Sequence, residues 1–480
     1  MPESLKQKSI KSILWSFSSR SCIQVVQFII SIILARLLSP EDYGVVGLAY
    51  VAIALVECFG NLGIGGAAVQ QKEIDELDFN TYFWAEACIR FLIFGVIFFT
   101  APFFATYYKK PILTKLIRVI VISGLLGIIQ AVPNLKMTRA MDFKTPSLIG
   151  VVATIISSLI AIVCAFSDLG MWVLVVQNVV STFVSTVLLL WRCPWWPHLQ
   201  FSWKRFCIFI NFGYKLLFSG ILDCLYNNIS SLIIGKAFSI EALGFYNKGN
   251  KVPQLAMNAI NTPINGIAFP MFSRLPDDPE KYKAAMRHSL KTSLFFIAPL
   301  LTLLAIVARP LVMLLYGEKW LPAVPFFRIM AIVYIFYPIQ TLNLGAILGK
   351  GRSDIFLKLE IKRKTIGILL KLLFFPFGLI WFVGSSLLDT FFCVIINTSP
   401  LKRLVGYSTL AQLADIWIGL IGSIVMAALL IPLNYLKIHV LLTLCIQIPL
   451  GVLVYVAFNY FFNKVFLLDC LAILKHILHR

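Results

Sequence analysis

The sequence predicts an all-helical polytopic membrane protein, and three observations lead to this prediction. First, 59% of the 480 residues are hydrophobic and only 13% are charged, whereas a soluble domain is about one-quarter charged. Second, apolar stretches of about 20 residues recur along the whole chain, each long enough to cross a hydrocarbon core of about 30 Å. Third, backbone groups in lipid must be hydrogen-bonded internally, so these stretches are expected to be helices.

The apolar stretches predict about fourteen transmembrane helices joined by short connections. The two longest connections, near 192–206 and 274–287, are too short to hold a folded domain. The expected spans are 12–38, 43–68, 80–106, 112–135, 145–167, 169–191, 207–236, 241–272, 288–315, 322–348, 355–377, 379–397, 410–433 and 438–462.

The distribution of Lys and Arg predicts the orientation of these spans. If the N-terminus is inside, most of the basic residues fall in the inner segments, as cytoplasmic loops require. Both termini are therefore expected in the cytoplasm. This bias also explains the net charge of +20, so nucleic acid is not an expected partner. The ten cysteines and five histidines are scattered, and no metal or other cofactor is expected from them.

The chain contains an internal repeat. Residues 31–44 and 231–244 align without a gap at an offset of 200, and a weaker similarity links 139–143 with 352–356. Such a duplication predicts two six-helix lobes, 1–206 and 207–403, related by a pseudo-twofold axis along the membrane normal. Residues 404–480 would then hold helices thirteen and fourteen and a cytoplasmic tail. The identical pairs in the repeat are Ser31 and Ser231, Ile33 and Ile233, Ser39 and Ser239, Glu41 and Glu241, and Gly44 and Gly244.

The first copy of the repeat predicts a tight turn followed by a new helix. Ser39 stands where an N-cap residue belongs, and Pro40 stands at the first helical position. Glu41 and Asp42 would lie in the first turn, at the positive end of the helix dipole. We interpret the repeat as a structural feature that marks equivalent points in the two halves.

Three stretches of the sequence resemble bacterial polysaccharide flippases. They are ARLLSPEDYG after the first span, FGYKLLFSGILDCLYNNISSLIIGKAFSIEALGFYNK across the seventh and eighth, and GKGRSDIFLKLEIKRK at the eleventh. Flippases with these stretches form the polysaccharide transport branch of the multidrug/oligosaccharidyl-lipid/polysaccharide exporter superfamily, which includes O-antigen and colanic-acid flippases. The resemblance covers nearly the whole chain.

The resemblance implies a transporter rather than an enzyme. Its substrate would be an undecaprenyl-diphosphate-linked oligosaccharide repeat unit, moved by alternating access from the cytoplasmic to the periplasmic leaflet of the inner membrane. The product would feed the synthesis of a surface polysaccharide such as lipopolysaccharide, beside polymerases and glycosyltransferases. Coupling to a proton or sodium gradient is also implied, and we take a monomer as the working assumption.

Charged residues inside the spans are the candidates for a substrate site, because each needs a partner, a cavity or a ligand. A cationic cavity between the lobes could replace the hydration of a pyrophosphate. The alternatives are snorkelling to the interface, the lining of a water-filled vestibule and hydrogen bonds between helices. The substrate-binding candidates are Arg20, Lys215, Asn227, Lys248 and Lys251, with Tyr246, Asn247 and Asn250 beside the last two.

Carboxylates inside the spans are the candidates for ion coupling, because a desolvated carboxylate can bind a proton. These candidates are Glu57, Glu86 and Asp223. Glu86 also stands four residues before Arg90, a spacing that favours an ion pair within one helix.

Other functions remain open at this stage. A lipid II flippase or a multidrug/cation antiporter would share the same architecture. A membrane-embedded polysaccharide polymerase or ligase is less expected, because the chain has no sizeable external loop and no recognisable set of nucleophile, base and acid.

Overall fold

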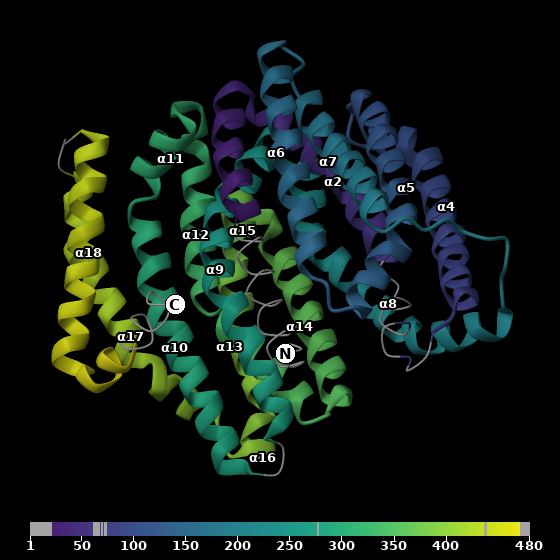
Figure 1. Ribbon diagram of the computed structural model, residues 1–480. Helices are drawn as coiled ribbons and strands as arrows, with labels where there is room; N and C mark the ends of the chain where they lie inside the picture. The colour runs from purple at the N-terminus through teal and green to yellow at the C-terminus, as the bar shows by residue number, and fades with distance from the viewer. Residues whose placement is uncertain are drawn as a thin grey trace, which may run out of the picture. The chain divides into compact units, whose positions relative to one another are not determined.

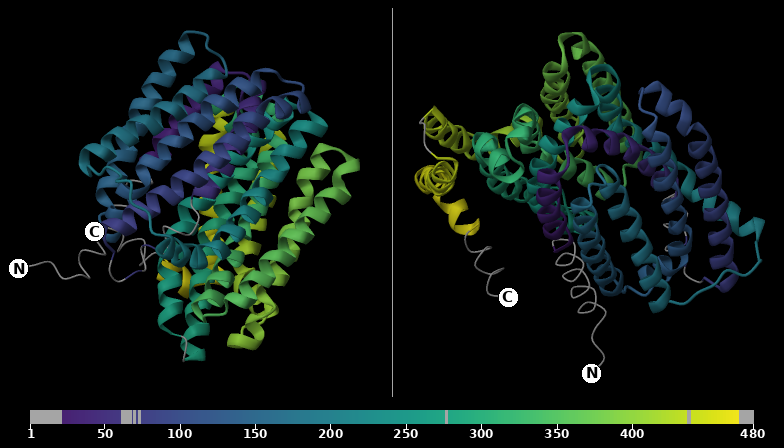
Figure 2. Two further views of the ribbon diagram at one scale, coloured as in Figure 1. Left: turned by 90° about the vertical axis from the view of Figure 1, so that its right-hand side faces the viewer. Right: turned by 90° about the horizontal axis from the view of Figure 1, so that it is seen from above.

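The computed structural model describes residues 22–60, 68, 71, 74–275, 278–435 and 439–470. These residues form helices and connecting turns, and no strand occurs among them. They pack as two compact units, Met1–Gly244 and Phe245–Arg480. Within each unit the helices run side by side as a bundle (Figures 1 and 2). The predicted all-helical fold is thus confirmed.

In the first unit, α5 is the central helix, because it packs against α2, α4 and α7. The helix α9 starts in this unit and continues into the second. The helices of the first unit are Cys22–Leu37, α2 (Pro40–Gly60), α4 (Glu76–Tyr107), α5 (Ile112–Arg139), α6 (Lys144–Phe166), α7 (Trp172–Arg192), α8 (Trp203–Ile233), the π-helical turn η1 (Ile234–Phe238) and the start of α9 (Ile240–Arg274).

In the second unit, α10 takes the central place and packs against α12, α13, α17 and α18. The elements after α9 are α10 (Pro279–Ile306), α11 (Ala308–Tyr316), η2 (Glu318–Ala323), α12 (Val324–Ile335), α13 (Tyr337–Gly349), α14 (Ser353–Phe374), η3 (Phe375–Phe377), α15 (Leu379–Thr398), α16 (Leu401–Val405), α17 (Thr409–Leu430), η4 (Ile431–Tyr435) and α18 (Val440–Phe462).

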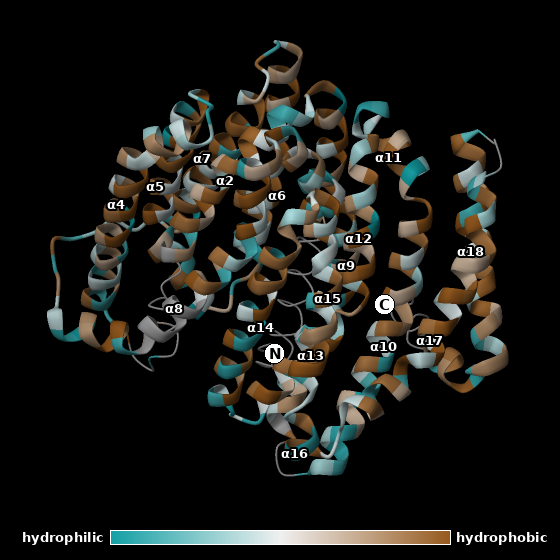
Figure 3. Cartoon of the chain, turned by 180° about the vertical axis from the view of Figure 1, so that it is seen from behind, coloured by the Kyte–Doolittle hydropathy of each residue, from teal (hydrophilic) through white to brown (hydrophobic). Residues whose placement is uncertain are grey.

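Nine helical segments of the described chain are long and apolar enough to cross a membrane. Many of their large apolar side chains are exposed, and apolar residues predominate along α4 and α18 (Figure 3). On α4, for example, Phe99 and Phe103 are 73% and 77% exposed, as expected of side chains that face lipid. Each of the fourteen predicted spans overlaps a helix in the described ranges, but 288–315 covers α10, α11 and the turn at Val307 between them. The number of fourteen crossings itself stays a prediction.

Both copies of the repeat begin a helix, as predicted. The backbone N–H of Asp42 donates to the Ser39 hydroxyl at 3.1 Å, and that of Ala242 donates to the Ser239 hydroxyl at 2.9 Å. In the first copy the Asp42 carboxylate also accepts from the backbone N–H and the hydroxyl of Ser39, at 2.9 and 2.7 Å. Ser39 and Ser239 are therefore N-caps that satisfy N–H groups of the first helical turn.

The starts of α2 and α9 cross at Gly44 and Gly244. A Cβ atom at Gly44 would lie 1.8 Å from the carbonyl oxygen of Ile240, and one at Gly244 would lie 1.9 Å from that of Pro40. Pro40 and Ile240 are themselves equivalent in the repeat. The crossing is therefore reciprocal, as a local twofold axis between the two helix starts requires, and it leaves room for glycine alone.

Candidate functional site

A polar cavity of about 480 Å³ lies in the first unit among α2, α4, α5 and α7. Three charged side chains line it, Glu57 from α2 and Glu86 and Arg90 from α4. The structure thus brings together two of the three carboxylates that the sequence marks for ion coupling. Amide and hydroxyl side chains of α5 and α7 complete the wall: Ser123, Gln130, Asn134, Thr138, Asn178, Ser181, Thr182 and Ser185.

Glu86 is held at this cavity by Arg90. The Arg90 Nε donates to Glu86 Oε1 at 2.7 Å, which confirms the ion pair expected from the spacing. Gly127 gives the guanidinium its space, because a Cβ at that position would lie 2.5 Å from Arg90 Nη1. Glu86 is only 1% exposed, and its second oxygen, Oε2, has no hydrogen-bond partner in the described chain. That oxygen is available to a proton or a small cation.

Glu57 supplies the second carboxylate of the cavity. It lies four residues after Ile53, which also lines the cavity and so shares one face of α2 with it. Its side chain is exposed, and it forms no ion pair within the described ranges. With Glu57 and Glu86 ionised and Arg90 charged, these three groups carry a net charge of −1, which favours the entry of a cation.

The two lysines predicted on α9 lie in different surroundings. Lys248 is 4% exposed, and its ammonium nitrogen lies 5.0 Å from the ring centroid of Tyr316 and 5.8 Å from that of Trp320. These distances are typical of cation–π contacts within the second unit. Lys251 is exposed instead. Of the two, Lys251 is the lysine whose ammonium can reach an external anion.

The remaining predicted site residues belong to the first unit. On α8, Asn227 is exposed and Asp223 is half-buried one turn earlier, while the Asn228 amide donates to the Cys224 carbonyl at 2.8 Å. Lys215 is also on α8, but its side chain lies outside the described part of the structure, as does all of Arg20. The prediction that these residues face a shared cavity stays a prediction.

Two sites in the second unit contain none of the substrate-binding or ion-coupling candidates named in the sequence analysis. One is a pocket of about 460 Å³ between α9 and α13, which contains three asparagines, Asn258, Asn261 and Asn265. Their spacing of three and four residues is the signal that could have revealed it. The other is a mostly apolar cavity of about 650 Å³ with Arg309 and Arg328 in its wall, among α10, α11, α12, α17 and α18.

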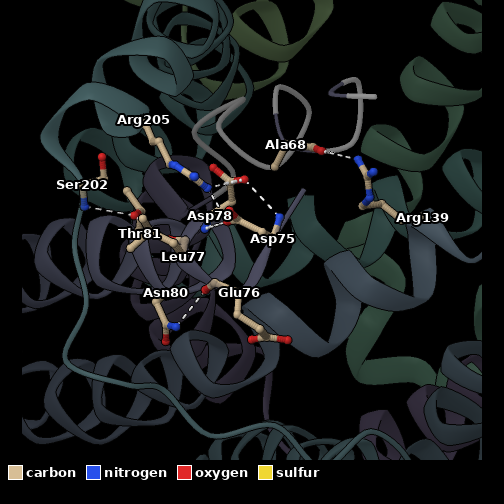
Figure 4. A network of polar contacts seen from close by, with 10 residues as sticks. All are labelled: Ala68, Asp75, Glu76, Leu77, Asp78, Asn80, Thr81, Arg139, Ser202 and Arg205. Atoms are coloured by element: carbon tan, nitrogen blue, oxygen red, sulfur yellow. Dashed lines mark hydrogen bonds and ion pairs between the residues drawn. The ribbon is translucent and has the colours of Figure 1, made fainter. Parts of the chain in front are cut away.

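A polar network fixes the start of α4, the helix that carries Glu86 and Arg90 (Figure 4). Asp75 is its N-cap and accepts from the backbone N–H of Asp78 at 2.9 Å. Arg205, from the start of α8, pairs with Asp75 and also with Asp78, the latter at 2.7 Å. The hydrogen bond from the Arg205 guanidinium lowers the pKa of Asp75 to about 2. The carboxylate therefore stays ionised at neutral pH.

The segment between α7 and α8 is tied to the same helix. The Asn80 side chain accepts from the backbone N–H of His198 at 2.7 Å, and the Thr81 hydroxyl accepts from that of Ser202 at 3.2 Å. Glu76 accepts from Trp195 Nε1 at 3.0 Å. These contacts fix the first turns of α4 and so position the cavity residues further along it.

Comparison with protein families gives one match over more than half of the chain. The profile of the family described as "Polysaccharide biosynthesis protein" matches residues 33–325.

No group of three or more His, Cys, Asp or Glu side chains in the described part of the chain is arranged to hold a metal ion.

Three curated proteins are similar to the chain along most of its length, each at 24% identity. The teichuronic acid biosynthesis protein TuaB of Bacillus subtilis aligns over 351 residues, 71% of each chain. The lipopolysaccharide biosynthesis protein WzxC of Escherichia coli aligns over 367 residues, 75% of this chain and 73% of WzxC. The succinoglycan biosynthesis transport protein ExoT of Rhizobium meliloti aligns over 319 residues, 66% of this chain and 64% of ExoT.

Two kinds of solved structure share the fold. The lipid II flippase MurJ in an inward closed conformation superposes with a TM-score of 0.76 at 14% identity, covering 95% of this chain and 99% of MurJ. An inward-facing multidrug resistance transporter of the MATE family superposes with a TM-score of 0.63 at 13% identity, covering 80% of this chain and 95% of that one. At these identities the likeness concerns the fold.

Proposed function

Because the chain belongs to the polysaccharide biosynthesis protein family, we propose that it is a flippase for a lipid-linked oligosaccharide. It would move an undecaprenyl-diphosphate-linked repeat unit from the cytoplasmic to the periplasmic leaflet of a bacterial inner membrane by alternating access, with both termini in the cytoplasm. The similarity to ExoT, a succinoglycan biosynthesis transport protein, and to WzxC, a lipopolysaccharide biosynthesis protein, supports this proposal. The fold shared with a lipid II flippase and a drug transporter supports it as well.

The observation that carries the proposal is the charged cavity among apolar helices of the first unit. Ionisable groups at membrane depth are costly, so they are retained where they bind a substrate or an ion. Glu57 and the second oxygen of Glu86 offer two positions for a proton or a sodium ion beside the fixed charge of Arg90. Binding and release of that cation would shift the protein between its inward-facing and outward-facing states and so drive the transport cycle.

The substrate has three parts, a polyprenyl chain, a pyrophosphate and sugars, and the described residues include groups that suit each of them. The polyprenyl chain can stay in lipid, beside the exposed apolar faces of helices such as α4 and α18. The pyrophosphate needs cations, for which Lys251 and the guanidinium groups of Arg309 and Arg328 are available. The sugars need hydrogen-bonding groups, which the amide-lined pocket supplies.

The experiment that tests the function is replacement of the chromosomal gene by variants. Loss of the protein, or Glu57→Gln together with Glu86→Gln, is expected to reduce surface polysaccharide and to leave lipid-linked repeat units in the cytoplasmic leaflet. Glu318→Gln, which changes a carboxylate outside the cavity, is the matched control. Immunoblots of membranes establish that the variant proteins are present at equal amounts.

Two other outcomes would assign a different function. Accumulation of peptidoglycan precursor, with normal surface polysaccharide, would identify a lipid II flippase. Unchanged lipid-linked intermediates together with a loss of drug resistance would identify a multidrug/cation antiporter.

A further inference from the structure

One face of α9 carries a row of amide side chains. Successive members are three or four residues apart, so they fall on one side of the helix. The first and last members are eighteen positions apart, or about 27 Å at 1.5 Å per residue, which is close to the thickness of the hydrocarbon core. The amide row consists of Asn247, Asn250, Gln254, Asn258, Asn261 and Asn265.

Side chains of α12 and α13 hold parts of the amide row in place. The Tyr334 hydroxyl donates to Asn250 Oδ1 at 2.8 Å. Further along, the Asn265 amide donates to Thr341 Oγ1 at 3.1 Å, and the Thr341 hydroxyl donates to Asn261 Oδ1 at 3.2 Å. Asn250, Asn261 and Asn265 are therefore fixed in orientation before any ligand arrives, which lowers the entropic cost of binding.

The last three members of the amide row line the pocket of about 460 Å³ between α9 and α13. Asn258 and Thr262 line it, and neither side chain makes a hydrogen bond within the part of the chain that the structure describes. On the opposite wall, Tyr337 contributes an aromatic ring, and Gly345 leaves open space, because a Cβ there would meet no atom within 4 Å. None of the residues that line the pocket is charged.

By the internal repeat, the helices of this pocket correspond to helices that line the charged cavity of the first unit. By the offset of 200, α9 corresponds to α2, and the similarity of 139–143 to 352–356 makes α13 the counterpart of α5. The helices α2 and α5 line the cavity that contains Glu57, Glu86 and Arg90. Equivalent helices thus enclose a charged cavity in one unit and a neutral, amide-lined pocket in the other.

We propose that the pocket between α9 and α13 binds uncharged sugar residues of the lipid-linked oligosaccharide. The inference rests on the proposed function and names the part of the substrate that this pocket takes. Sugar hydroxyls both donate and accept, and a carboxamide offers two donors and an accepting oxygen in one plane. The ring of Tyr337 provides an apolar surface for the C–H face of a pyranose. The absence of charged groups from the lining makes the pocket unsuited to pyrophosphate or to a coupling cation.

The test compares two lipids that differ by one hexose. Undecaprenyl diphosphate and undecaprenyl-diphosphate-glucose are titrated into the purified full-length protein in detergent, and binding is followed by microscale thermophoresis. The wild-type protein is expected to bind the glucosylated lipid about tenfold more tightly, the effect of one or two added hydrogen bonds. The variant Asn258→Leu with Thr262→Val is expected to bind both lipids equally, with its affinity for the unglycosylated lipid unchanged.

Two further variants separate the pocket from general stability. Gly345→Leu fills the pocket without removing a hydrogen bond, and it is expected to abolish the tenfold preference as well. Asn343→Leu is the matched control, because this α13 amide faces away from the pocket and exchanges hydrogen bonds of 2.9 and 3.0 Å with Gln412. It should lower thermal stability while the preference for the glucosylated lipid remains.

The possible failures are distinguishable. If the wild-type protein binds both lipids with equal affinity, or if both pocket variants keep the preference, the sugar pocket is refuted while the flippase proposal stands. If the wild-type protein binds neither lipid, the proposed function itself is refuted.

Discussion

The crossing of α2 and α9 allows a quantitative prediction for the substitution Gly244→Ala. The new methyl carbon would lie 1.9 Å from the Pro40 carbonyl oxygen and 3.3 Å from the Gly44 backbone nitrogen. A comfortable carbon–oxygen contact is roughly 3.4 Å, so the two helix backbones must separate by more than about 1 Å. Forced overpacking costs about 1–3 kcal/mol when side chains can adjust. Here the clashing atom belongs to the backbone, which cannot adjust as a side chain can, so we expect the free energy of unfolding to fall by about 3 kcal/mol or more.

The assay for this prediction is thermal unfolding of the purified protein in detergent, followed by intrinsic fluorescence. Gly95→Ala is the matched control, because a Cβ at Gly95 in α4 would meet nothing within 4 Å. Replacing a helical glycine at an open position is expected to stabilise the protein slightly, by about 0.5–1 kcal/mol. Gly44→Ala combined with Gly244→Ala should cost less than the sum of the single losses, because one separation of the helices relieves both clashes. Equal melting temperatures for Gly244→Ala and Gly95→Ala would refute the reciprocal crossing.

Three further predictions follow from the described contacts. Because Arg205 lowers the pKa of Asp75 to about 2 from a usual value near 3.9, the ionised pair stabilises the fold above about pH 4, and that contribution is lost as the pH falls toward 2. Arg205→Ala should therefore be less stable than wild type at pH 7 and lose less stability on acidification, and parallel pH profiles of melting temperature would count against the pair. Lys248→Ala should lower the free energy of unfolding by about 2 kcal/mol or more, and the amount of protein in membranes, because it leaves a cavity at a buried position. Lys251→Ala should change the free energy of unfolding by less than about 0.5 kcal/mol. A larger loss for Lys251→Ala in thermal melts would show that the burial of Lys248 is wrong. Gly127→Ala should displace the Arg90 guanidinium from Glu86 and reduce surface polysaccharide at normal protein level, and unchanged polysaccharide would remove Arg90 from the mechanism.

The sequence was sufficient for the helices and for contacts within one helix. Lipid forces a spanning segment to satisfy its own backbone, so hydropathy alone predicts helices. Ser39 could be recognised as a cap because capping depends on neighbours within one turn. The pair of Glu86 and Arg90 followed from the four-residue spacing for the same reason.

Contacts between helices could not be predicted in this way. Lys248 and Lys251 are three residues apart, yet the rings of Tyr316 and Trp320 bury the first and leave the second exposed. Those rings come from α11 and η2, and no local pattern places them beside α9.

Charge alone was also a poor guide to the second unit. Glu360 pairs with Arg363 at 2.8 Å and with Lys364 at 3.1 Å, so these charges on α14 contact one another, and Glu360 and Lys364 are buried. The pocket between α9 and α13 contains no charged side chain, and its amides become a site only because α13 lies opposite them.

The central claim, that this chain translocates a lipid-linked oligosaccharide by using the cavity of Glu57 and Glu86, is tested most directly in proteoliposomes. A fluorescent undecaprenyl-diphosphate-linked oligosaccharide is placed in both leaflets, and its accessibility to an added glycosidase is followed under an imposed proton or sodium gradient. We predict that one of the two gradients accelerates the exchange of label between leaflets, and that Glu57→Gln with Glu86→Gln removes the acceleration in equally reconstituted protein. Exchange no faster than in protein-free liposomes, or acceleration that survives both substitutions, would contradict the account.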